Sequence, residues 1–202
     1  IQPPGPNPEA GGQDGIGLDT QGDPGRSLIA LVDNPDITIH QLMESITGPD
    51  FPTGGYICGR AGIREAYETG RGIIVIRSKT HIEQRGTHGE SIIITEIPFQ
   101  QNKASLVEKI ALLVKDKRIT SIVDIRDESD RHGVRVVLDL RKDEIPEVVI
   151  NQLYKMTPLQ KSFGIILLCI VNNKPEILNL KQILQHFLIH RKTVVYRRTA
   201  FE

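Results

Sequence analysis

The chain has 202 residues, of which 39% are hydrophobic and 25% are charged, as in an ordinary globular domain. Its 25 basic and 25 acidic residues cancel, which argues against a whole-surface nucleic-acid binder but not against a local basic face. No stretch approaches the roughly 20 apolar residues that span a bilayer, and the N-terminus lacks a signal-peptide pattern. Cys58 and Cys169 have no CxxC partner, which favours two small buried thiols in a reduced, cytoplasmic setting.

Residues 1–26 differ from everything after them. Seven glycines and five prolines fall within this segment, with almost no large apolar side chain. Such a segment buries too little surface to offset the entropy lost on ordering it. We therefore predict a disordered or aberrant Gly/Pro-rich segment over 1–26 and ordered structure from Ser27 onward.

In the next part of the chain, short helices and strands alternate with turns and with stretches rich in Gly and Pro, which interrupt regular structure. The turn at 33–36 precedes a short helix that Thr38 caps, and residues 48–55 are so rich in Gly and Pro that they must be irregular. A helix is expected over 60–69. Strands are expected over 73–83 and 91–97, joined as a hairpin.

The second half carries longer apolar patterns. Asn102 is the expected N-cap of a helix to about Lys117, followed by strands over 121–126 and 134–141. A further helix starts near Asp143 with a proline in its first turn, and the apolar run 163–171 is expected to be one buried strand.

From Leu180 apolar residues recur at helical spacing to the end of the chain, opposite a basic face. The order of elements predicts an α+β fold, in which helices pack on an antiparallel sheet over 27–178 and a long C-terminal helix follows over 179–202.

No catalytic set emerges from the residues. Tyr196 precedes Arg197 and Arg198, which could lower the pKa of a phenol and hold a phosphate. Consecutive helix residues point in different directions, however, so a tyrosine that packs its ring and keeps its hydroxyl in water is the favoured interpretation.

An acidic group at 124–130 with His132 suggests either a metal site or local ion pairing. Because Arg126 and Arg131 are interspersed among the carboxylates, ion pairing and turn chemistry are favoured. The histidines show no HExxH or similar spacing, so the sequence supports no metal site.

The glycine pairs match neither a GxxxxGK[ST] nor a GxGxxG phosphate motif. The turn Gly70-Arg71-Gly72 could aim Arg71 at a phosphate, and turn geometry alone also explains the glycines. Basic residues gather between 60 and 118 with acidic residues interleaved, so a DNA-facing strip and a plain solvated surface are both open.

Seven sequence blocks carry a resemblance that runs from about Leu28 to the end of the chain. They are LVDNPD at 31–36, GPDFPTGG at 48–55, GRAGIREAYETGRG at 59–72, TEIPFQQNKASLVEKIA at 95–111, IRDESDRHGVRVVLDL at 125–140, TPLQKSFGI at 157–165 and NLKQILQHFLIHRKTVVYRRTAFE at 179–202. On these blocks the chain resembles the A-subunit family of bacterial DNA gyrase, the DNA-cleaving subunits of type IIA DNA topoisomerases. The segment 1–26 lies outside the resemblance.

The resemblance implies a tower-like domain over 27–178 and the start of a coiled-coil helix over 179–202. It places the nucleophilic tyrosine upstream, on a winged-helix domain, so no catalytic residue and no metal ligand is carried over. ATP and Mg²⁺ would belong to the partner, the B subunit of gyrase. The family also implies a homodimer of A subunits through the coiled coil, double-stranded DNA as substrate, no membrane, and a location at the bacterial nucleoid in the cytoplasm.

The family role also gives meaning to the basic residues. Bending a duplex of about 20–30 bp costs of order 1–6 kcal/mol, and lateral cations would offset part of that cost through phosphate contacts. The expected backbone contacts are Arg60, Arg64, Arg71, Lys79 and Lys103. The implied function is a part of the breakage-reunion subunit, inactive by itself, in ATP-dependent supercoiling. The alternatives are a fragment of the topoisomerase IV A subunit and a non-catalytic DNA-binding or scaffold module.

Overall fold

A computed structural model of the chain describes residues 20–85 and 89–201. These residues form two compact units: one from the described part of 1–50 with 66–70 and 166–202, the other from 51–65 with 71–165. Most of the Gly/Pro-rich segment predicted to be disordered lies outside the described residues, and the first element that the structure describes is a strand at Thr20–Gly22. The boundaries at 26 and 178 remain predictions.

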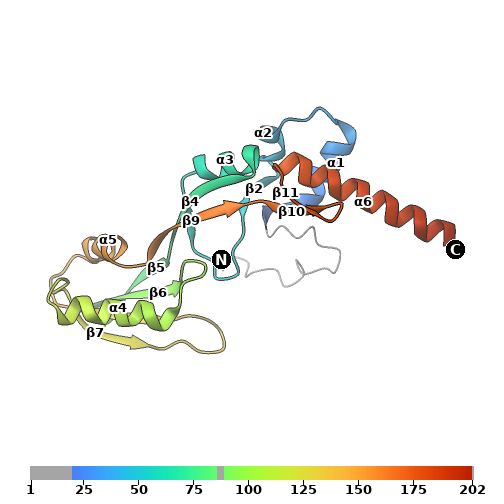
Figure 1. Ribbon diagram of the computed structural model, residues 1–202. Helices are drawn as coiled ribbons and strands as arrows, with labels where there is room; N and C mark the ends of the chain where they lie inside the picture. The colour runs from blue at the N-terminus through green and yellow to red at the C-terminus, as the bar shows by residue number, and fades with distance from the viewer. Residues whose placement is uncertain (1–19, 86–88, 202) are drawn as a thin grey trace. The chain divides into compact units, whose positions relative to one another are not determined.

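The first unit packs three helices beside a two-stranded sheet. Strand β1 (Thr20–Gly22) pairs antiparallel with β2 (Ile46–Pro49), and helices α1 (Pro24–Asp33) and α2 (Ile39–Leu42) connect them (Figure 1). Thr38 caps α2 in a capping box, as predicted. The long C-terminal helix α6 (Leu180–Phe201) is confirmed, and its first turns contact α1 and α2.

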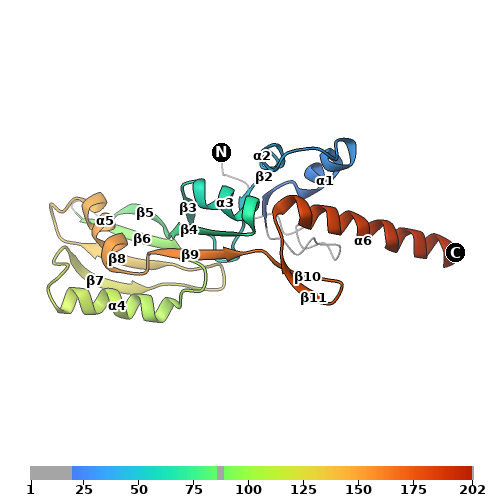
Figure 2. The ribbon, with the colours of Figure 1, turned by 45° about the horizontal axis from the view of Figure 1, so that its top comes forward.

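The expected single buried strand over 163–171 is wrong. The segment divides into β9 (Gln160–Ile166) and β10 (Leu168–Val171), and β10 forms a hairpin with β11 (Lys174–Ile177) in the first unit (Figure 2). Ile166, Leu168 and Ile170 are 57%, 61% and 79% exposed. The apolar run therefore spans two sheets and leaves one side of β10 in water.

The second unit contains a four-stranded antiparallel sheet in the order β5-β6-β8-β7. Its strands are β5 (Lys79–Arg85), β6 (Gly89–Glu96), β7 (Ile122–Asp127) and β8 (Val136–Leu140). Helices α4 (Lys103–Lys115) and α5 (Pro146–Met156) bury Leu106 and Leu153 against Ile92 and Leu138 of the sheet. The α+β class with helices packed on antiparallel sheet is confirmed.

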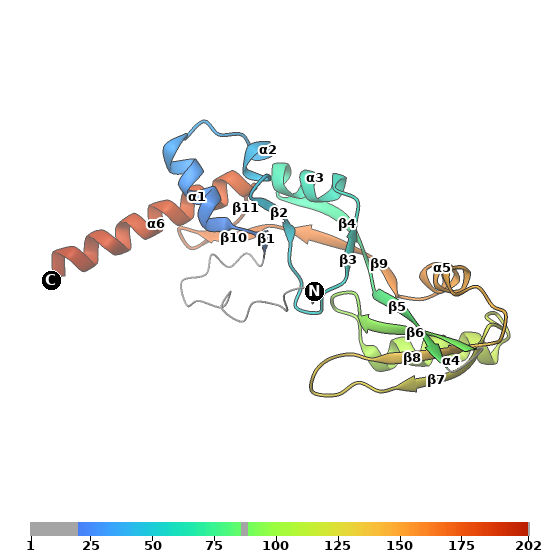
Figure 3. The ribbon, with the colours of Figure 1, turned by 180° about the vertical axis from the view of Figure 1, so that it is seen from behind.

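A second sheet in this unit has the order β3-β4-β9, with β3 (Tyr56–Cys58) and β4 (Arg71–Arg77) antiparallel and helix α3 (Ala61–Thr69) between them in sequence (Figure 3). The expected single strand over 73–83 is wrong, because it breaks at Ser78 into β4 and β5 of different sheets. The buried Ser78 N–H donates to the carbonyl of Leu159, just before β9, at 2.8 Å, where the chain passes from one sheet to the other.

Candidate nucleic-acid interface

Two of the expected DNA contacts lie at the start of α3. Arg60 immediately precedes α3 and Arg64 lies in its first turn, where the Arg64 N–H donates to the Arg60 carbonyl at 3.0 Å. Both side chains are exposed. Among residues 20–85 and 89–201 neither forms an ion pair. These two guanidinium groups can therefore meet an external anion without first losing a carboxylate.

Arg71 is exposed at the first position of β4. It follows Gly70, whose φ of +81° suits glycine, and a Cβ there would lie 2.8 Å from the Leu178 carbonyl oxygen. Backbone geometry thus accounts for Gly70 by itself.

The two expected lysine contacts already have acidic partners. Lys79 Nζ lies 3.3 Å from a Glu96 carboxylate oxygen, and Lys103 Nζ lies 2.7 Å from Asp127. The hydrogen bond from Lys103, with those from Ser129, lowers the pKa of Asp127 to about 2. Ion pairs at this exposure contribute roughly 0–1 kcal/mol, so a phosphate can compete for either lysine. A contact of Lys79 or Lys103 with DNA would therefore require a phosphate to displace Glu96 or Asp127.

A buried carboxylate that was not predicted from the sequence organises the face of the four-stranded sheet opposite α4 and α5. Asp139, on β8, is 0% exposed and accepts hydrogen bonds from Ser91 at 2.6 Å, from Arg126 at 2.5 Å and from Arg85. Burial by itself raises the pKa of Asp139, but the hydrogen bonds from Arg126 and Ser91 and the charges of Arg126 and Arg85 outweigh it and hold the pKa below its ordinary value. The sequence feature that could have revealed this buried carboxylate is the single Asp in the otherwise apolar strand VVLDL.

The rest of this face is also charge-paired. Arg126 lies 2.9 Å from Asp124 and 3.2 Å from Glu128, which confirms local ion pairing in the acidic segment. Arg135 reaches Glu83 at 2.7 Å and Glu128 at 3.1 Å. The carboxylates outnumber the arginines in this network, so this face offers a phosphate little net attraction.

Tyrosines and clustered acidic side chains are the groups that strand cleavage would use. Burial raises the pKa of Tyr67, which opposes the activation that a nucleophile needs. Tyr196 is 77% exposed on α6. Within the described ranges no three His, Cys, Asp or Glu side chains gather as a metal site, and no helix is long and apolar enough to cross a membrane.

The comparisons with known proteins define the class first. Residues 22–202 match the family model that describes the A subunit of DNA gyrase/topoisomerase IV. The chain therefore belongs to the family of DNA gyrase and topoisomerase IV A subunits.

Among individual relatives, it is 57% identical over 175 residues to the DNA gyrase A subunit of Staphylococcus epidermidis, covering 86% of this chain and 20% of that protein. It is also 57% identical to the DNA gyrase A subunit of Halalkalibacterium halodurans, over 87% of this chain and 21% of the relative. The same protein of Clostridium acetobutylicum gives 57% over 175 residues. The chain thus spans about a fifth of the length of these curated relatives.

Proposed function

We propose that this chain is a DNA-backbone-binding and scaffolding part of the breakage-reunion subunit of DNA gyrase. The observation that carries the proposal is the pair Arg60 and Arg64, exposed at the start of α3 without an ion pair in the described residues, with the exposed Arg71 at the start of the following strand. Such contacts fix a duplex in place without reading its bases. Lys79 and Lys103 add to them when phosphate displaces Glu96 and Asp127.

In the whole enzyme this part acts in ATP-dependent change of DNA supercoiling, as an isomerase of the type II topoisomerase class. The partners are double-stranded DNA, the gyrase B subunit and a second A subunit joined through the coiled coil that α6 begins. ATP and Mg²⁺ act through the B subunit, and the enzyme works in the bacterial cytoplasm. The 202-residue chain alone holds DNA without cutting it. The family includes topoisomerase IV, but the relatives at 57% identity named above are DNA gyrase A subunits, which favours gyrase.

Charge reversal tests the assignment of the contacts. In R60E/R64E the affinity for a duplex should fall at any sequence, and the slope of log affinity against log salt should become shallower by about 2. R71E/K103E should likewise lower the affinity for the duplex and make the salt slope shallower. The measurement is fluorescence anisotropy of a labelled duplex titrated at several salt concentrations.

The matched control is R141E/K142E, which changes the same charge at two exposed residues after β8 of the same unit. It should leave the salt slope nearly unchanged. Equal losses in the control and in R60E/R64E would mean that only net charge matters, and the proposed contact surface would be withdrawn.

A further inference from the structure

Arg77, the last residue of β4, carries an exposed guanidinium group that is held from two sides. Its Nε donates a hydrogen bond to the side-chain oxygen of Gln160 at 2.5 Å, and its Cζ lies 5.0 Å from the centre of the Tyr154 ring. The face of the ring attracts the cation, and the hydrogen bond fixes the plane of the group. Arg77 therefore has less side-chain freedom than an arginine that projects into water.

The two side chains that hold Arg77 are themselves fixed by the fold. Tyr154 lies on α5, and its hydroxyl donates a hydrogen bond to the carbonyl of Ser78 at 3.1 Å. Because Ser78 is buried and directly follows Arg77, this bond ties the ring to the segment that carries the guanidinium group. Gln160 is the first residue of β9, the strand beside β4 in the three-stranded sheet. The supports of Arg77 thus come from two elements other than its own strand.

The two terminal nitrogens of Arg77 are available to an external acceptor. Within the part of the chain that the structure describes, Arg77 forms no ion pair, and its hydrogen bond to Gln160 uses Nε alone. Lys79, two residues later, differs because its ammonium group is already paired with Glu96. The fork of a guanidinium group matches two oxygens of a phosphate, and such charge-assisted hydrogen bonds are strong. Arg77 is therefore suited to bind a phosphate.

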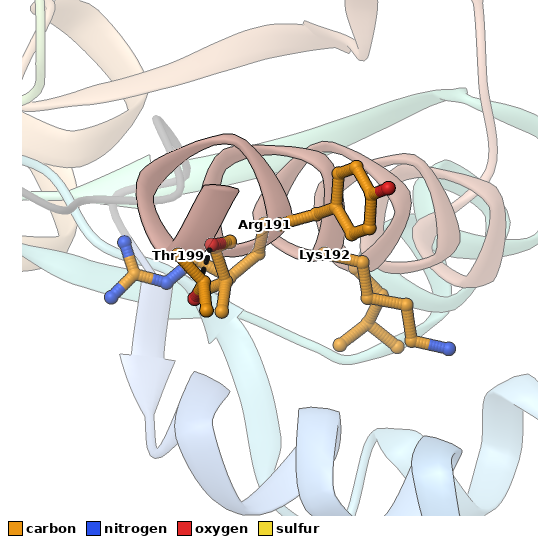
Figure 4. A pocket seen from close by; sticks show the side chains of 6 residues that line it. Arg191, Lys192 and Thr199 are labelled. Carbon is orange, nitrogen blue, oxygen red and sulfur yellow. Dashed lines mark hydrogen bonds between the residues drawn. The ribbon is translucent and has the colours of Figure 1, made fainter. Parts of the chain in front are cut away.

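Lys192 on α6 shows the opposite arrangement of a basic side chain. Its ammonium group extends away from the helix, beside a groove (Figure 4). That groove is lined by Leu188, Arg191, Lys192, Val195, Tyr196 and Thr199. A long side chain that extends into water loses rotamer freedom when it binds an anion. Arg77 has already lost this freedom on folding, so a phosphate contact costs it less entropy.

Arg77 lies on the same face of the three-stranded sheet as Arg71. Side chains alternate between the two faces of a strand, and Arg71, Ile73 and Arg77 are the exposed residues of β4. The six residues from Arg71 to Arg77 span roughly 20 Å. Over that length a duplex offers several phosphates, because it carries one charge per about 1.7 Å of its axis. The two arginines can therefore contact the same duplex.

We propose that Arg77 is a further contact with the DNA backbone, and that Tyr154 and Gln160 are positioning residues that orient its guanidinium group toward a phosphate. The inference rests on the proposed function, because it places a duplex along the face that carries Arg71. It adds one phosphate contact, so the salt slope expected from Arg60, Arg64 and Arg71 alone becomes steeper by about 1. Since the contact is with phosphate, it is equal for all DNA sequences.

Single substitutions in the 202-residue chain separate the charge of Arg77 from its orientation, with anisotropy of a labelled duplex as the measurement. Arg77→Gln should lower the affinity about tenfold at low salt and make the salt slope shallower by about 1. Arg77→Lys should keep the slope and lower the affinity about threefold, because lysine keeps the charge but lacks the planar fork.

The two positioning residues have their own variants. Gln160→Ala and Tyr154→Leu should each lower the affinity about threefold without changing the salt slope, because each removes a support but no charge. Tyr154→Phe keeps the ring and should stay within about twofold of the parent chain. Thermal unfolding checks that each variant is folded. Parent affinity in both Gln160→Ala and Tyr154→Leu would overturn the positioning roles.

The matched control is Arg141→Gln, which removes the charge of another exposed arginine in the same unit. It should leave the salt slope unchanged, and an effect equal to that of Arg77→Gln would reduce the result to net charge and overturn the proposal. A parent slope in Arg77→Gln, with loss of affinity in R60E/R64E, would overturn the inference and leave the proposed function in place. The reverse pattern would support Arg77 and remove Arg60 and Arg64 from the contact surface.

Discussion

Gly62 sets the close approach of α3 to β4. A Cβ at this position would lie 1.9 Å from the Ile73 carbonyl oxygen, a backbone atom that cannot turn aside. Gly62→Ala should therefore lower the free energy of unfolding by more than about 2 kcal/mol, although alanine favours helices.

Chemical denaturation measures this effect, with Gly164→Ala as the control. A Cβ at Gly164 meets nothing within 4 Å, so that change should stay within about 0.5 kcal/mol. Equal stability of both variants would show that α3 does not lie this close to the strand.

The Glu83 carboxyl makes the stability of the folded state depend on pH in the acidic range. Hydrogen bonds from Arg135 and then His81 lower its pKa from 4.5 to about 2. A carboxyl whose pKa is depressed by folding stabilises the folded state fully above its unfolded pKa, and this contribution is lost as pH falls through the folded value. The relevant window runs from pH 4.5 down to about 2.

In Arg135→Gln the pKa of Glu83 should move back toward 4.5, and the acid dependence of stability in this window should weaken. A carbon-detected NMR titration of the Glu83 carboxyl measures the shift directly. A Glu83 pKa that stays near 2 in the variant would assign the depression to another group.

At the scale of elements, α4 shows how a local signal fixes a helix end. The Asn102 side chain accepts a hydrogen bond from the Ser105 N–H at 3.1 Å. Asn102→Ala should cost about 1 kcal/mol of stability, because it removes the cap. Thermal unfolding measures it, and Asn151→Ala, at an exposed interior position of α5, should be neutral or stabilising. A larger loss at Asn151 than at Asn102 would contradict the capping argument.

Elements set by local chemistry could be predicted from the sequence. The caps Thr38 and Asn102, the hairpin of β5 with β6 and the long C-terminal helix were all predictable because their signals lie within a few residues. The breaks at Ser78 and at Leu167 were not, because each depends on which sheet the flanking strands join. An apolar run gives no information about such a choice of partner.

The candidate site shows the same limit. The exposure of Arg60 and Arg64 agrees with a solvated basic surface, as the sequence allowed. The partners of Lys79 and Lys103 lie 17 and 24 residues away in sequence, so only the fold reveals them. The contact of all five residues with DNA stays a prediction.

Over the whole molecule, a net charge of zero conceals an uneven distribution. The face of the four-stranded sheet opposite α4 and α5 neutralises its arginines with carboxylates, whereas Arg60 and Arg64 at the start of α3 form no ion pair within the described residues. The proposed contact of a DNA backbone with the start of α3 requires such cations without carboxylate partners.

The salt dependence of duplex binding by the 202-residue chain tests this account most directly. With Arg60, Arg64 and Arg71 on phosphates, log affinity should fall with log salt at a slope of about −3, equally for unrelated DNA sequences. No DNA strand should be cut. An affinity for the duplex that does not change with salt, or no detectable binding at low salt, would contradict the proposal that this chain is the part of the enzyme that binds the DNA backbone.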